Sequence, residues 1–119
     1  MNEEFRDLKT RTKQFALRII RLYKSLPNTV EAQIIGKQIL RSGTSVGAQY
    51  REATRARSDA EFVSKIESGL QELEETIYWL ELLIESQTFK AEKISNLQKE
   101  ADELAAILVA SVKTVKLRK

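Results

Sequence analysis

The sequence predicts an all-α protein: an antiparallel up-down-up-down four-helix bundle in which residues 1–119 form one domain. Three observations predict this fold. Apolar residues recur at alternating spacings of three and four in four successive stretches, the pattern of helices that pack side by side. One proline and four glycines in 119 residues leave few interruptions. The breaks between the stretches are short, and short connections make neighbouring helices antiparallel.

The first two helices are expected at about residues 3–26 and 29–55. The first should end at Leu26, because a proline disfavours helical backbone in the residue before it. The second should begin at Asn28 or Thr29, with Asn28 and Glu31 spaced as a capping box. The apolar seam of the first helix comprises Phe5, Leu8, Thr12, Phe15, Ile19, Leu22 and Leu26. The seam of the second comprises Ile35, Ile39, Ser42, Val46, Gln49 and Ala53.

The last two helices are expected at about residues 58–86 and 90–117. Ser58 and Glu61 form a capping box at the start of the third helix. Its seam comprises Phe62, Ile66, Leu70, Leu73, Ile77, Leu80 and Ile84. The seam of the fourth comprises Ile94, Leu97, Ala101, Leu104, Leu108, Ser111 and Val115.

The stretch RSGTSVGAQY, residues 41–50, is unusual for a helix interior. It contains two glycines one turn apart, and each costs about 1 kcal/mol relative to alanine. Three interpretations explain them: close packing inside the bundle, for example against Trp79 or Tyr78; a contact between subunits; or a ligand or RNA approaching the exposed backbone. The candidate residues for helix packing or a subunit interface are Ser42, Gly43, Ser45, Gly47, Gln49 and Tyr50.

Three polar residues of this stretch fall on the seam side of the helix. Ser42 and Ser45 can donate to the carbonyl one turn earlier, which satisfies a buried hydroxyl locally. Gln49 has no such local solution, and buried polar groups are nearly always hydrogen-bonded. We therefore expect Gln49 to bond to another helix and to help fix the register of packing.

The net charge of +3 is unevenly distributed. Residues 58–89 contain one basic and eight acidic residues, whereas the rest of the chain is basic. Basic helix faces can bind phosphate backbones in a salt-dependent way, without reading sequence. Alternatively, they are solvated, pair with acidic residues of a neighbouring subunit, as Arg6, Arg21 or Arg41 would, or bind an acidic protein. The candidate residues for nucleic-acid or partner binding are Arg41, Arg51, Arg55, Arg57, Arg21 and Lys24.

The residue inventory argues against an enzyme. The chain has no cysteine and no histidine, so it lacks a thiol nucleophile and the Glu-x-x-His motifs of di-iron bundles. No catalytic residue, metal ligand or cofactor is predicted. The carboxylates Glu72, Glu75, Glu81 and Glu85 are interpreted as a solvated face or as partners for arginine. No secretory leader or membrane-length apolar run occurs, so we expect a cytoplasmic protein without membrane contact.

The stretch RSGTSVGAQYREA, together with Ser58, Phe62 and ETIYWLELL at residues 75–83, resembles a family of small bacterial four-helix bundles. Its members include proteins encoded in intervening sequences of 23S ribosomal RNA genes and the accessory variability determinant of diversity-generating retroelements. The resemblance covers about residues 5–115. Gln49 stands where the family usually has asparagine, and Ala53 where many members have glycine.

This resemblance implies a bundle that assembles into a ring-shaped homopentamer. It also implies a possible nucleic-acid partner, RNA or DNA. The retroelement relative has RNA and a reverse transcriptase as partners. For this chain the resemblance therefore supplies more about fold than about function.

Overall fold

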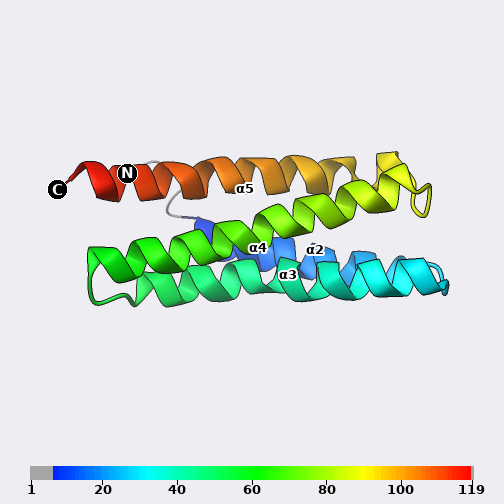
Figure 1. Ribbon diagram of the computed structural model, residues 1–119, viewed down its shortest axis with the longest axis horizontal. Coiled ribbons are helices and arrows are strands. Elements are labelled where there is room, and N and C mark those ends of the chain that lie inside the picture. Colours follow the sequence, from blue (N-terminus) through cyan, green and yellow to red (C-terminus); the bar gives the residue numbers. More distant parts are fainter. Residues whose placement is uncertain (1–6, 119) are drawn as a thin grey trace.

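The computed structural model describes residues 7–118, which form an up-down-up-down bundle of four helices (Figure 1). The expected start of the first helix at residue 3, with Phe5 and Arg6, lies outside the described residues. Each of the other helix ends is within two residues of its expected position. The helices are α2 (Leu8–Ser25), α3 (Val30–Thr54), α4 (Asp59–Glu85) and α5 (Ala91–Leu117).

The helix ends follow local chemistry. Leu26 has extended backbone before Pro27, with ψ 148°, and this ends α2 as predicted. The N-cap of α3 is Thr29, whose hydroxyl accepts from the Ala32 amide at 3.2 Å. The predicted capping box of Asn28 and Glu31 is therefore wrong, because the extended backbone that presents a cap lies one residue later. Ser58 caps α4 as expected by accepting from the amide of Glu61 at 3.1 Å.

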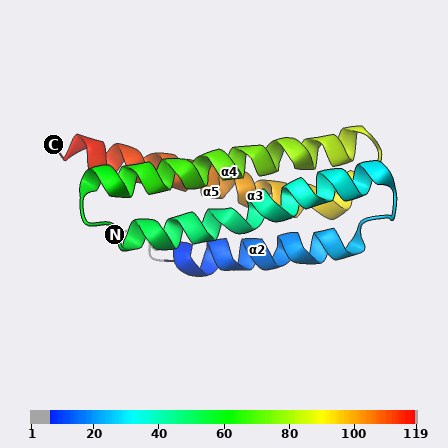
Figure 2. The ribbon, with the colours of Figure 1, turned by 60° about the horizontal axis from the view of Figure 1, so that its bottom comes forward.

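The helices form a ring in the order of the chain, with extents of 49 × 21 × 20 Å (Figures 1 and 2). We call the end with the α3–α4 connection the α3–α4 end, and the other the α2–α3 end. Within residues 7–118, helix contacts link only neighbours in the ring. Contact is most extensive between α3 and α4 and least extensive between α2 and α5. The α2–α5 edge is therefore the loosest side of the bundle.

The two glycines of residues 41–50 face α2 within the same chain. A Cβ added at Gly43 would lie 2.7 Å from Ile19 Cγ1, and one added at Gly47 would lie 3.2 Å from Thr12 Oγ1. The suggested contact with Trp79 or Tyr78 is wrong, because those residues are on α4 and the glycine face points the other way. The missing side chains let α2 and α3 lie close together.

Because α3 packs against two helices, it buries a wider face than its predicted seam. Gly36, Gly43 and Gly47 are buried on the side of α2, whereas Ile35 and Gln49 are only half-buried. On the side of α4, the hydroxyls of Ser42 and Thr76 are 2.7 Å apart in the core. Thr76 also donates to the Glu72 carbonyl at 2.9 Å, so Ser42 donates to Thr76. Ser42 thus bonds across the helix pair, whereas Ser45 donates to the Arg41 carbonyl at 2.7 Å.

Replacing Gly43 by alanine should destabilise the protein relative to the same change at Gly69. Both substitutions gain helix propensity of about 1 kcal/mol. A Cβ at Gly43 would overlap the branched stem of Ile19, whereas one at Gly69 would meet Gln49 Cβ at an ordinary 3.4 Å. Overpacking costs about 1–3 kcal/mol. Chemical denaturation should therefore place Gly43→Ala about 1–3 kcal/mol below Gly69→Ala in unfolding free energy, and equal values would contradict the close approach of α2 to α3.

Candidate nucleic-acid interface

Arg41 lies at the middle of α3, and two carboxylates of α4 already neutralise its charge. Its guanidinium is 3.2 Å from Glu72 Oε1 and 2.9 Å from Glu75 Oε1. The hydrogen bond to Glu72 is the main reason that the pKa of Arg41 is raised above its ordinary value. Glu72 and Glu75 are thus arginine partners, as interpreted from the sequence. Glu81 and Glu85 are exposed on α4. Because Glu72 and Glu75 compensate its charge, Arg41 should attract a phosphate less strongly than an arginine without an ion pair.

The α3–α4 end contains three arginines that are close in sequence: Arg51, Arg55 and Arg57. Arg51 is in the last turn of α3, Arg55 is its C-cap residue, and Arg57 is in the connection to α4. All three side chains are exposed, and none forms an ion pair with another part of residues 7–118. The nearby Glu52 carboxylate accepts from Lys65 Nζ at 2.7 Å. We call these three residues the arginine group.

Arg21 and Lys24 lie at the other end of the molecule. Both are exposed near the C-terminus of α2, at the α2–α3 end. The six predicted binding residues therefore do not form one surface. They divide into the arginine group at the α3–α4 end, the paired Arg41 at mid-length, and Arg21 with Lys24 at the α2–α3 end.

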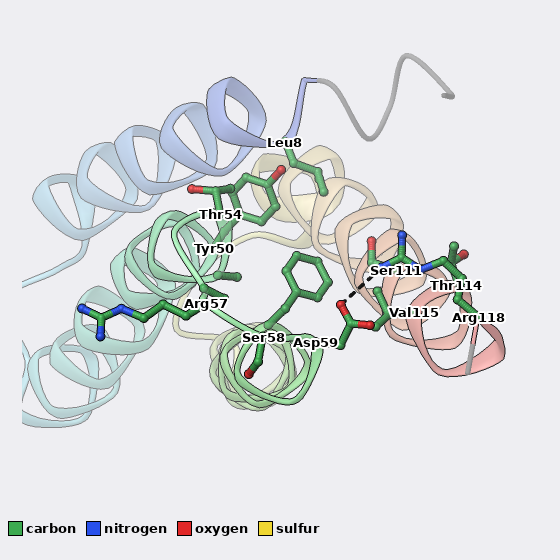
Figure 3. Close-up of a pocket in the computed structure, with 13 residues that line it drawn as sticks. Leu8, Tyr50, Thr54, Arg57, Ser58, Asp59, Ser111, Thr114, Val115 and Arg118 are labelled. Atoms are coloured by element: carbon green, nitrogen blue, oxygen red, sulfur yellow. Dashed lines mark hydrogen bonds and ion pairs between the residues drawn. The ribbon is translucent and has the colours of Figure 1, made fainter.

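An end cleft of about 720 Å³ opens at the α3–α4 end, where all four helices contribute residues (Figure 3). Its walls are largely apolar, from Leu8, Ala53, Phe62 and Val115. Burial raises the pKa of the half-buried Tyr50 hydroxyl above its ordinary value. One wall is closed by the ion pair of Arg118 and Asp59, 3.5 Å apart. The side chain of Arg57 extends away from the other labelled residues in Figure 3, so its charge faces solvent.

Gln49 does not make the bond to another helix that its position predicted. Its Oε1 is buried and has no hydrogen-bond partner in the part of the chain that the structure describes. Trp79 Nε1 on α4 is in the same condition, and its ring packs edge-on against Tyr78 at 5.1 Å. The Gln49 stem instead packs beside Gly69. The register of α3 and α4 is thus held by Ser42 with Thr76 and by Arg41 with its two carboxylates.

An arginine in the first turn of α2, which sequence reasoning missed, joins α2 to α5. Arg11 donates to both oxygens of Glu100, at 2.6 and 3.1 Å, and to Glu103 at 3.1 Å. The Arg11 side chain is 18% exposed and that of Glu100 is 20% exposed, so water screens the pair only partly. Hydrogen bonding to Glu100 is the main reason that the pKa of Arg11 is raised. The sequence places Arg11 beside the seam residue Thr12, so an arginine at the edge of a helix contact could have been predicted. Its partner Glu100 could not, because the sequence of one helix does not identify the residues that face it.

Two further properties of residues 7–118 bear on function. No helix among them is both long and apolar enough to cross a membrane. Likewise, no set of three or more acidic side chains in this part of the chain gathers closely enough to hold a metal ion.

The sequence and the structure are both similar to those of known proteins. Residues 6–110 match the family described as 23S rRNA-intervening sequence protein. A crystal structure of a protein of unknown function from Bacteroides thetaiotaomicron VPI-5482, described as from the S23 ribosomal protein family, is 42% identical with a TM-score of 0.84. The similarity covers 89% of this chain and 98% of that chain. No curated protein matches the sequence significantly.

Replacing Arg11 by methionine should destabilise the bundle while keeping the aliphatic stem in place. The change leaves Glu100 half-buried without its bidentate partner, a loss of about 1–2 kcal/mol. Lys13→Met is the matched control, because Lys13 is exposed on the same helix and forms no ion pair within the described residues. Thermal unfolding should show a melting temperature several degrees lower for Arg11→Met than for Lys13→Met. Equal values would contradict a stabilising role for this pair.

Proposed function

The chain belongs to the 23S rRNA-intervening sequence protein family, and we propose that it is a non-enzymatic, self-associating bundle that binds structured nucleic acid. The observation that carries the proposal is the arginine group: Arg51, Arg55 and Arg57 are exposed and form no ion pair within residues 7–118, whereas Arg11 and Arg41 are matched to carboxylates. The family is named for intervening sequences of 23S rRNA, and the arginine group suits a phosphate backbone, so structured RNA is the first ligand to test.

The electrostatics favour contact with the phosphate backbone. Eight of the chain's acidic residues are concentrated in residues 58–89, so the outer face of α4 should repel nucleic acid. The arginine group lies at the end of α3, where its guanidinium groups can donate to phosphate oxygens. Such contacts release counterions and carry no sequence information. Binding should therefore depend on the shape and charge of the ligand.

Self-association is proposed from the family resemblance, with a pentamer as the expected form. Val30, Ile34 and Tyr78 support it because they expose apolar surface, with Val30 75% accessible and Ile34 59%. A ring of five copies would multiply the arginine group fivefold and strengthen phosphate binding through multivalency.

The non-enzymatic part of the proposal rests on residue chemistry. The chain has no histidine and no cysteine, so the commonest general base and the thiol nucleophile are both missing from the whole sequence. An acidic protein, a reverse transcriptase included, is the alternative partner for the same cations.

Each arginine of the group should contribute measurably to RNA affinity, whereas Arg41 should not. Fluorescence anisotropy of a structured RNA, titrated across a salt series, should show that Arg51→Ala, Arg55→Ala and Arg57→Ala each weaken binding. Each should also reduce the log–log salt slope by about 0.7–0.9, as expected for one lost phosphate contact. Arg41→Ala removes the same formal charge and is the matched control.

If wild type does not bind RNA or duplex DNA even at low salt, the nucleic-acid proposal is wrong, and capture of an acidic protein becomes the favoured role. If Arg41→Ala weakens binding as much as the other three substitutions, the arginine group is not the interface.

The oligomer should be visible as mass in solution. Light scattering coupled to size exclusion should give five times the 13.6 kDa of one chain. Ile34→Glu should reduce that mass, because it places a charge on the exposed apolar start of α3, whereas Lys37→Glu one turn away is the exposed-site control. A monomeric wild-type protein would refute self-association.

A further inference from the structure

The α2–α5 edge contains a second cleft, at the α2–α3 end, which we call the α2–α5 cleft. It has a volume of about 370 Å³. Arg18, Arg21 and Ser25 line it from α2, and Phe89, Lys93 and Leu97 line it from the α4–α5 turn and from α5. Three of its side chains are cationic, and no carboxylate lines it. The volume is at the lower end of the range of about 300–1,000 Å³ for ligand sites.

The cleft lies one heptad along this edge from the ion pair of Arg11 and Glu100. Arg18 is seven residues after Arg11 on α2, and Lys93 is seven residues before Glu100 on α5. Because the two helices are antiparallel, these two steps lead in the same direction along the edge. Arg11 and Glu100 form an ion pair at 2.6 Å. One heptad further along the edge, Arg18 and Lys93 line the same cleft. A heptad continuation of the pairing would require an acidic residue where Lys93 stands.

The three cations of the cleft, Arg18, Arg21 and Lys93, have no carboxylate partner among residues 7–118. Lys93 Nζ lies 5.8 Å from the centre of the Phe89 ring, a cation–π contact that leaves its charge available. The Ser25 hydroxyl donates to the Leu22 carbonyl at 2.8 Å. The cleft therefore presents positive charge that an anion would neutralise.

We propose that the α2–α5 cleft is a binding site for a phosphate group and that, in the complex with nucleic acid, it holds a backbone phosphate. The assignment to a backbone rests on the function proposed above. The two guanidinium groups can donate in pairs to phosphate oxygens, and Lys93 adds a point charge from the opposite wall. The arginine group is at the other end of a molecule 49 Å long, so the cleft is a separate contact.

The decisive variant is Lys93→Glu. It supplies the acidic residue that the heptad pattern lacks, so it should pair with Arg18 or Arg21 and raise the melting temperature by a few degrees. The same variant should lower RNA affinity about tenfold or more at moderate salt, because one phosphate contact is lost and a repulsive charge is added. Lys93 is in the first turn of α5, where the helix dipole also favours an acidic residue, so the loss of RNA affinity relative to the control below carries the test.

Lys99→Glu is the matched control. Lys99 is exposed on the same helix and lines no cleft described above, and its substitution changes the net charge equally. It should lower affinity by less than about threefold and should not raise the melting temperature, since exposed charges act weakly at a distance in salt. Arg18→Gln provides a second test, in which RNA affinity should fall without reversal of charge.

Inorganic phosphate distinguishes the source of the ligand. Phosphate should raise the melting temperature of wild type but not of Lys93→Glu, and it should compete with RNA for wild type. Stabilisation by phosphate without competition would overturn the assignment to a backbone phosphate. Equal loss of RNA affinity in Lys93→Glu and Lys99→Glu, with no response to phosphate, would overturn the cleft itself and leave the nucleic-acid function standing. Absence of RNA binding by wild type would instead refute that function.

Discussion

The close approach of α2 to α3 is the constraint on which the rest of the bundle depends. A Cβ at Gly43 would overlap Ile19, and a Cβ at Gly47 would press on Thr12 at 3.2 Å, so both positions hold the two helices close together. On its other side α3 is held to α4 by a buried hydroxyl pair and by Arg41. Contact between α2 and α5 is much less extensive than the contacts of α3. At that edge the ion pair of Arg11 and Glu100 joins the two helices.

Charge is arranged in this bundle by pairing some cations and leaving others free. Arg11 and Arg41 bind two carboxylates each and stabilise helix contacts. The arginine group and the α2–α5 cleft keep their charge available, and they lie at opposite ends of the molecule. Exposed ion pairs contribute little to stability, so these cations have little effect on folding and are open to the polyanionic partner proposed above.

The fold followed from the heptad spacing, because buried apolar contacts between long helices leave a regular trace in sequence. What Gly43 packs against was not predictable, since a glycine has no side chain to indicate a direction. The hydrogen bond expected from Gln49 to another helix is absent from the described residues. Spacing shows that a side chain faces a neighbouring helix, but it does not show that this helix carries a hydrogen-bonding group there. The cleft was missed for a similar reason: Arg18 and Lys93 come from helices distant in sequence, and only their register brings them together.

The central claim is that phosphate contacts the arginine group and the α2–α5 cleft, and not α4. Amide chemical-shift mapping of the protein, titrated with a short RNA hairpin, tests it most directly. The account predicts perturbations at the C-terminus of α2, the N-terminus of α5 and the C-terminus of α3, with the outer face of α4 unchanged. Perturbations concentrated on α4, or none at saturating RNA, would contradict it.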